Sequence, residues 1–314
     1  MNLEEIANEC GLFNQENKSA VIENIIALEN KYSRGDLVII YNYCLTVCKF
    51  PDYIMELIRA EDKIRDKASL PVLIDILLGK TLEMSEFPEE YVNVRVMCAK
   101  AIANLKDTSA VHALLYCLNN KNENYKVRFA CADALGKIGD KYAVAPLIDV
   151  VKDEDEKSLY IRESAASALG MLGDIRAIDP LVSILETKNG ILDKFTFLKE
   201  RILEALGKLK ISNNQRVFNV LKNSLMDESP QIRINAIEAL MESDIPQAFE
   251  TIKSCLLDKD DEVKRNALIA LYNMSDRSIL DEIISDKKYS EFLKEEANSI
   301  IEEYETDDEE RKYE

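Results

Sequence analysis

The sequence is poor in the residues on which many catalytic and metal-binding sites depend. Its 314 residues include a single histidine, His112, no tryptophan, nine glycines and seven prolines. A Ser-His-Asp or Cys-His catalytic centre, or a metal site with several histidine ligands, would have to be built around His112 alone. A many-stranded sheet protein would need more glycine and proline at its tight turns. The composition therefore favours a helical protein without a histidine-based active site, metal or cofactor.

Positive charge and long apolar runs are also scarce. Lysine and arginine total 40 against 58 aspartates and glutamates, which gives a net charge of -18 at pH 7. Such a chain is an unfavourable partner for nucleic acid or an anionic membrane surface. The nearest approach to a membrane span, residues 37–48, is too short, and the N-terminus lacks an apolar run of signal-peptide length. We therefore expect a cytoplasmic protein that binds neither nucleic acid nor membranes.

Seven cysteines form an odd set without a C-x-x-C pair. This usage fits a reducing compartment better than a disulfide framework. Cys44 and Cys48 would share one face of a helix, where a metal or redox pair is conceivable. Without a second pair or a nearby histidine, the favoured interpretation is two small core residues.

A 14-residue motif recurs along the chain. The segment VRFACADALGKIGD at 127–140 returns 34 residues later as IRESAASALGMLGD at 161–174. Related segments begin at residues 94, 198, 232 and 263. A period near 34 residues is typical of repeat proteins in which one supersecondary unit is stacked many times. The chain therefore contains six copies of one unit.

Each copy of the motif has the periodicity of a helix with one apolar face. In the copy that begins at Val127, the apolar positions are Val127, Cys131, Ala134, Leu135 and Ile138. This spacing matches a 3.6-residue period and excludes a strand. A second, shorter apolar segment fills the rest of each period, so each unit is a helix pair. Such pairs bury their apolar faces only by stacking.

The turns between these helices carry recognisable capping residues. Asp140 and Asp174 stand just before the shorter segments, where a carboxylate can accept hydrogen bonds from free N–H groups. Gly136, Gly139, Gly170 and Gly173 fall near the end of the longer helix, as expected of C-terminal caps and tight turns.

The motif V-R-x-x-A-x-x-A-L-G-x-[IL]-G-D, followed by x-x-A-x-x-P-L-[IV], resembles the HEAT-like repeat of the phycobilisome lyase type. The copies at Val127 and Ile161 match over nearly the whole unit, and the resemblance covers about residues 66–276. The signatures of tetratricopeptide and ankyrin repeats are absent. The resemblance implies an all-α fold, a right-handed α-solenoid of stacked antiparallel helix pairs, similar to HEAT and armadillo proteins.

The resemblance also implies a structural ladder that joins neighbouring repeats. In this family an arginine at the second motif position commonly pairs with the aspartate that ends the motif. Lys199 and Lys264 replace arginine, and a lysine cannot form the planar bidentate pair that arginine forms. The ladder residues would be Arg95, Arg128, Arg162 and Arg233 with Asp107, Asp140, Asp174 and Asp276.

The flanks divide the chain further. Residues 1–65 are expected to form an N-terminal helical cap, 66–276 six HEAT-like repeats, and 277–304 a C-terminal helical cap. Residues 305–314 are expected to form an acidic, disordered tail. Insertions at 81–91 and 187–197 lengthen two connections, and their Phe87, Phe195 and Phe197 either contact a partner or fold back on the core.

The resemblance implies that the longer helix of each pair lines the concave side of the solenoid. Motif positions off its buried stripe mix carboxylates with apolar groups, which suits a basic or amphipathic helix or an extended peptide. A solvated face with a few apolar residues between repeats is an equal alternative. The candidate partner-binding residues are Phe129, Asp133, Glu163, Ser167, Glu200, Glu204, Ile234, Glu238, Met241, Arg265, Ile269 and Tyr272.

Three classes of function follow from these residues. The favoured one is a non-enzymatic interaction scaffold, adaptor or regulatory protein, expected to be a monomer. The alternative is a bilin lyase-like, chromophore-handling protein that acts on a phycobiliprotein-type partner, which rests on the repeat resemblance alone. Nucleic-acid binding, as in HEAT-like DNA glycosylases, would need a basic concave stripe, which Glu163, Glu200, Glu204 and Glu238 contradict.

One enzyme of similar architecture is excluded. Deoxyhypusine hydroxylase needs paired His-Glu motifs for its two irons, and here His112 is followed by Ala113. His112 occupies a helix-start position, where we expect a surface or capping residue.

Overall fold

The structure is a computed structural model. It describes residues 1–14, 18–80, 89–156, 158–187, 196–209, 211–212 and 214–310, without the side chains of 303–310. These residues form 18 α-helices, several short 3₁₀ helices and no β-strand; Ser212 and Asp244 form one isolated bridge. The predicted all-α class is confirmed.

The chain divides into two compact units, Met1–Leu172 and Gly173–Glu314. The first contains α1 (Leu3–Glu9), α2 (Lys18–Leu28), α3 (Arg34–Val47), α4 (Pro51–Ile64), α5 (Leu70–Leu77), α6 (Glu90–Leu105), α7 (Val111–Asn119), α8 (Tyr125–Ile138), α9 (Val144–Lys152) and α10 (Leu159–Leu172). The second contains α11 (Ile178–Glu186), α12 (Thr196–Lys208), α13 (Gln215–Ser224), α14 (Pro230–Met241), α15 (Ala248–Ser254), α16 (Asp261–Met274), α17 (Ser278–Ser285) and α18 (Glu291–Glu310).

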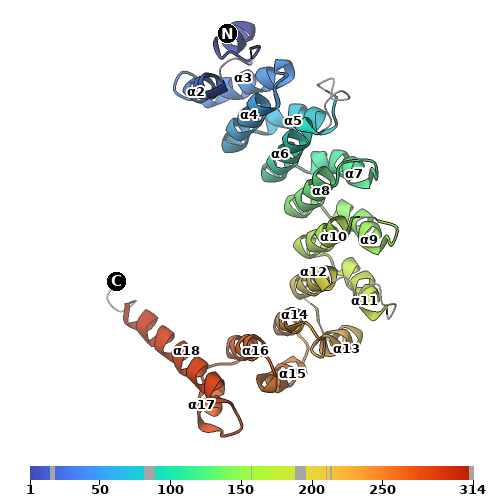
Figure 1. Cartoon of the computed structure of the whole chain (residues 1–314), viewed down its shortest axis with the longest axis vertical. Coiled ribbons are helices and arrows are strands. Elements are labelled where there is room, and N and C mark those ends of the chain that lie inside the picture. Colours follow the sequence, from blue (N-terminus) through green and yellow to red (C-terminus); the bar gives the residue numbers. More distant parts are fainter. Residues whose placement is uncertain are drawn as a thin grey trace. The chain divides into compact units, whose positions relative to one another are not determined.

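Helix pairs stack within each unit. In the first unit α5 packs on α6, α7 on α8 and α9 on α10, while α6, α8 and α10 pack on one another in that order (Figure 1). In the second unit α12, α14, α16 and α18 form the corresponding row, paired with α11, α13, α15 and α17. We call the even-numbered helices from α6 to α16 the second helices and their shorter partners the first helices. The prediction of stacked helix pairs is confirmed.

The predicted aspartate caps are confirmed as well. Asp140 and Asp174 precede the short 3₁₀ helices η3 (Lys141–Ala143) and η4 (Ile175–Ala177), which lead into α9 and α11. Each carboxylate accepts a hydrogen bond from the N–H two residues on, at 2.9 and 3.0 Å. Gly139 ends α8 with a φ of 82°, a left-handed conformation that suits glycine.

Gly136 has a different function from the predicted cap. It lies inside α8 and is buried, and a Cβ built on it would stand 2.9 Å from the Cα of Ala168 in α10. A side chain there would separate two helix backbones, because Cβ atoms do not approach other atoms so closely. Gly136 therefore permits the close packing of neighbouring second helices.

Gly136→Ala is expected to lower the free energy of unfolding by about 1–3 kcal/mol, because the clash with the α10 backbone outweighs the higher helix propensity of alanine. Gly35→Ala in α3 is the matched control, since a Cβ there meets no atom within 4 Å. The control is expected to raise stability by about 0.5 kcal/mol. Urea denaturation measures both, and equal gains for the two variants would contradict the packing role of Gly136.

The N-terminal helices enclose much of the core of the first unit. Tyr41 and Tyr53 are among the largest fully buried side chains, and α4 packs against α6.

All seven cysteines are buried and free, and burial raises the pKa of the Cys48 thiol to about 11. The interpretation of Cys44 and Cys48 as core residues is therefore confirmed.

The domain boundaries stay predictions, and these include the acidic tail at 305–314. Within that segment α18 extends to Glu310. Residues 311–314 lie outside the described residues. Phe87 and Phe195 lie outside the described residues, whereas Phe197 is exposed at the start of α12.

Candidate functional site

The predicted ladder has a different set of acidic partners. Arg128, at the start of α8, donates to both carboxylate oxygens of Glu156, at 3.1 and 2.6 Å, and to the carbonyl of Leu118 at 2.8 Å. Leu118 belongs to the first helix of the same pair, and Glu156 to the connection before the next second helix. The guanidinium thus joins one repeat to the next.

Other ladder positions repeat this arrangement. Arg95 pairs with Glu123 and donates to the carbonyl of Leu77, and Arg233 makes a bidentate pair with Asp258. Arg162 donates to the carbonyl of Val151. The pairing with the aspartates that end the motif was therefore wrong.

Those aspartates are already engaged as helix caps. Asp107, Asp140, Asp174 and Asp276 each accept the N–H two residues on. Hydrogen bonds from the hydroxyl and N–H of Ser109 lower the pKa of Asp107 to about 2, with a further contribution from Lys67. A carboxylate held in this way faces its own turn rather than the arginine of its motif.

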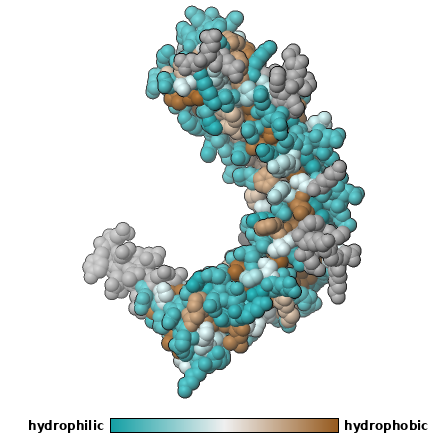
Figure 2. Space-filling view, in the orientation of Figure 1, coloured by the Kyte–Doolittle hydropathy of each residue, from teal (hydrophilic) through white to brown (hydrophobic). Residues whose placement is uncertain are grey.

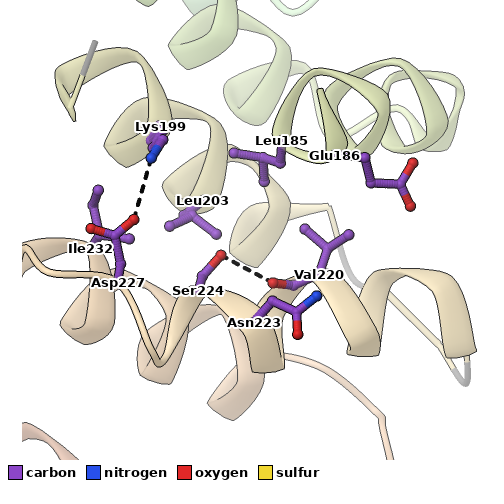
Figure 3. A pocket seen from close by; sticks show the side chains of 9 residues that line it. All are labelled: Leu185, Glu186, Lys199, Leu203, Val220, Asn223, Ser224, Asp227 and Ile232. Atoms are coloured by element: carbon purple, nitrogen blue, oxygen red, sulfur yellow. Dashed lines mark hydrogen bonds and ion pairs between the residues drawn. The ribbon is translucent and has the colours of Figure 1, made fainter. Parts of the chain in front are cut away.

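A pocket lies beside the ladder position that carries lysine. It is about 390 Å³ in volume and lies among α11, α12, α13 and α14 (Figure 3). Lys199 and Asp227 form an ion pair of 3.3 Å on one wall, and Leu203 and Val220 contribute apolar surface. Lys199 contacts Asp227 through one nitrogen, in contrast to the two-point pair of Arg128. A weaker ladder at this position stays a prediction.

Four of the predicted partner-binding residues lie on α8 and α10 in the first unit. Phe129 is exposed, while Asp133, Glu163 and Ser167 are partly exposed. Asp133 pairs with Lys137 one turn further along α8, at 2.8 Å. The stripe is accessible in this unit and combines an aromatic ring with carboxylates. Across the face seen in Figure 2, hydrophilic residues predominate and apolar residues are scattered among them.

In the second unit two of the predicted residues are buried. Glu200 is 8% exposed and Ile234 is 9% exposed, so neither offers a binding surface, and these two assignments were wrong. The reason is that neighbouring second helices pack closely here: the amide of Asn235 in α14 donates to the carbonyl of Glu200 in α12. Glu204 is partly exposed and Glu238 is exposed.

The carboxylates on α12 and α14 influence each other. Partial burial raises the pKa of Glu238, and the negative charge of Glu204 raises it further. Burial also raises the pKa of Glu200, with Arg201 acting to lower it and Glu204 to raise it. Arg201 forms an ion pair with Glu204 at 2.6 Å. These groups form an acidic cluster in which one cation, Arg201, accompanies three carboxylates.

The remaining predicted residues lie on α14 and α16. Ile269 is exposed, and Met241 and Tyr272 are partly exposed. Arg265 pairs with Glu296 of α18 at 2.7 Å and with Glu262 at 2.6 Å. Arg265 therefore links α16 to α18, and its charge is balanced within the chain.

The sequence interpretation did not include two exposed aromatic residues. Tyr125 is the first residue of α8 and Tyr160 is the second of α10, and their rings stack with centroids 6.2 Å apart. Both precede the repeated motif, so a search confined to motif positions passes over them. A useful signal was available: an aromatic residue stands one or two positions before the motif in both well-matched copies.

His112 lies on the surface, as expected. It is exposed near the start of α7, and its ring meets that of Tyr142 edge-on at 4.9 Å. Among the described residues no group of three or more His, Cys, Asp or Glu side chains could hold a metal ion. None of the helices in the described part of the chain is both long and apolar enough to cross a membrane.

The repeat is shared with a known family. The model of HEAT repeats matches residues 84–160, 123–196 and 192–273, which together make up more than half of the sequence. The chain belongs to the HEAT-repeat family. HEAT repeats stack helix pairs into extended surfaces, and this architecture is typical of protein-interaction scaffolds.

Three solved structures are similar to this chain to different degrees. The karyopherin Kap121p bound to the SUMO protease Ulp1p matches with a TM-score of 0.52 and 11% identity, over 94% of this chain and 36% of Kap121p. The complex of CpcE and CpcF of phycocyanin lyase from Nostoc sp. PCC7120 matches with a TM-score of 0.48 and 21% identity, over 73% of this chain and 92% of that one. An archaeal HEAT-like repeats protein from Thermococcus onnurineus NA1 has a TM-score of 0.43 and 14% identity, over 74% and 95% of the two chains.

Identities this low show the fold alone. This chain spans about a third of Kap121p. No match is found among curated proteins.

Proposed function

We propose that this HEAT-repeat protein is a non-enzymatic scaffold or adaptor that binds a basic segment of another protein on its second helices. The segment is a basic or amphipathic helix or an extended peptide, and the scaffold acts as a monomer in the cytoplasm. The observation that carries the proposal is the acidic cluster on α12 and α14, where Glu204 is partly exposed and Glu238 is exposed. A cationic segment bound there is attracted by both carboxylates.

The charge of the whole chain supports the same class of partner. A net charge of -18 attracts cationic segments and repels nucleic acid and anionic membranes. Kap121p, which shares the fold, is bound to another protein, Ulp1p, in one of its structures. Stacked helix pairs supply long surfaces for such complexes.

The proposal is tested by charge reversal at the acidic cluster. Glu204→Lys combined with Glu238→Lys is expected to weaken partner binding about tenfold, and the loss should be greatest at low salt. Glu200 is left unchanged in this test because it is buried. Quantitative affinity capture from extracts of the source cell, with wild-type and variant baits side by side, identifies the partner and measures its loss.

A matched control distinguishes the effect of altering this surface from the effect of changing the net charge of the chain. Glu250→Lys combined with Asp281→Lys makes the same change of charge on exposed positions of the first helix α15 and of α17. The control bait should retain the partner. Equal retention of the partner by the wild type, the Glu204 and Glu238 variant and the control at low salt would contradict a binding site at the acidic cluster. The insertions or the acidic end would then be the candidate sites. A bait without residues 305–314 tests the acidic end.

The proposal also includes the type of HEAT repeat to which the motif belongs. We assign the repeats at Val127 and Ile161 to the phycobilisome lyase HEAT-like type, on the motif that they share. A chromophore-handling activity is the alternative function that this type suggests. Incubation with a bilin and a phycobiliprotein subunit tests it, and a covalent coloured adduct would replace the scaffold proposal.

A further inference from the structure

Three exposed aromatic rings gather at the start of α8 and α10 in the first unit. Tyr125 is 47% exposed and Tyr160 is 61% exposed, and their rings stack with an angle of 30° between their planes. Phe129 follows Tyr125 by one helical turn and is 45% exposed. The carbonyl of Phe129 accepts a hydrogen bond from the hydroxyl of Ser164, one turn after Tyr160, so the two helices remain adjacent along this face.

These rings form one surface, which we call the aromatic cluster (Tyr125, Phe129 and Tyr160). Aromatic side chains bury a large area with little loss of conformational entropy, and tyrosine and arginine dominate the energetics of protein interfaces. The cluster is continuous with the accessible stripe of α8, because Asp133 lies one turn beyond Phe129.

The connection that leads into α10 is predominantly acidic, while Lys126, next to Tyr125, is exposed. The connection that leads into α10 contains Asp153, Glu154, Asp155 and Glu156 in succession. Asp153 pairs with Lys121 and Glu156 with Arg128, whereas Glu154 and Asp155 are exposed. The exposed carboxylates of this connection attract a cationic ligand to the start of α10.

Among cations, arginine fits this surface better than lysine. Its planar guanidinium stacks on aromatic faces and loses little hydration, while its N–H groups reach neighbouring carboxylates. The ammonium group of lysine is compact and strongly hydrated, so it gains mainly the attraction between charges. Exposed rings beside exposed carboxylates thus distinguish the two residues.

We propose that the aromatic cluster is an anchor for arginine side chains of the partner protein. The inference rests on the proposed function, since it specifies the residue by which the partner is held in the first unit. Arginines of the bound segment stack on Tyr125 and Tyr160 while the carboxylates around the cluster balance their charge.

Two peptides of equal length and charge test the anchor, one alternating arginine with serine and the other lysine with serine. Fluorescence anisotropy with the full chain is expected to show about five- to tenfold tighter binding of the arginine peptide. Tyr125→Leu combined with Tyr160→Leu should reduce its affinity to that of the lysine peptide and leave the lysine peptide unaffected. Tyr116→Leu with Tyr142→Leu is the control, since both of these tyrosines are exposed, in α7 and η3.

The outcomes separate the anchor from the scaffold proposal. Equal affinity of the two peptides for the wild type, or an arginine preference that survives the Tyr125 and Tyr160 substitutions, would overturn the anchor alone. If Glu204→Lys with Glu238→Lys leaves both affinities unchanged, the proposed acidic site is overturned and the anchor stands on the tyrosine variants. If neither peptide binds, both proposals are overturned.

Discussion

Arg128→Ala is expected to lower the free energy of unfolding by about 3–5 kcal/mol, because it leaves the buried carboxylate of Glu156 without its partner. The Arg128 and Glu156 side chains are 5% and 4% exposed, so the substitution leaves a largely buried carboxylate without its counter-charge. The substitution also removes the donor to the carbonyl of Leu118. Urea denaturation followed by circular dichroism measures the change.

Two further variants make this result specific. Arg128→Lys keeps the charge but loses the bidentate pair, so its stability should lie between those of the wild type and Arg128→Ala. Lys121→Ala removes the neighbouring exposed pair with Asp153 and should change stability very little. An equally small effect of Arg128→Ala would contradict the ladder that the structure shows.

Glu61 is expected to make the protein less stable as the pH rises through about 7. This carboxyl lies in the last turn of α4 and is 2% exposed. Burial raises its pKa to about 7; the hydrogen bond from Ser69 lowers it in part, and Asp66 raises it. Its second oxygen, Oε1, is buried without a hydrogen-bond partner among the described residues.

The direction of the effect follows from the raised pKa. The protonated carboxyl is the form that the folded state prefers, so its contribution to stability is complete below the unfolded-state pKa of about 4.5. The contribution is lost as the pH rises from about 4.5 through about 7, and it amounts to about 3 kcal/mol. Glu61→Gln imitates the protonated form and should abolish this part of the pH dependence.

Denaturation midpoints between pH 4 and pH 8 compare the two proteins. Above pH 7 the Glu61→Gln variant should be the more stable. Glu156→Gln is the opposing control: burial raises the pKa of Glu156, but hydrogen bonds from Arg128 and the N–H of Ser158 lower it overall. The contribution of Glu156 is therefore present above its unfolded-state pKa and lost as the pH falls. Parallel profiles for the wild type and Glu61→Gln would contradict the assignment to Glu61.

The sequence was sufficient to predict the helices, because their signal is local. The spacing of Val127, Cys131, Ala134 and Leu135 defines one helical face, and all four are buried. The caps at Asp140 and Asp174 likewise depend on the residues that follow them directly. Such features need no knowledge of how distant segments meet.

The acidic partners of the ladder arginines could not be predicted from the sequence. Arg128 could have paired with the aspartate that ends its motif or with Glu156, 28 residues away. The choice depends on which carboxylate already has another partner: Asp140 caps its own turn, and the connection into α10 places Glu156 against the guanidinium. Glu200 illustrates the same limit, because its burial follows from the close approach of α14 rather than from its position on α12.

Hydrogen–deuterium exchange of the full chain, with and without the captured partner, tests the central claim most directly. The account predicts that the partner slows exchange in the second helices, above all α12 and α14 around Glu204 and Glu238 and α8 and α10 around the aromatic cluster. The first helices α9, α11, α13 and α15 should exchange as in the free protein. Protection confined to those first helices would contradict a binding surface on the second helices.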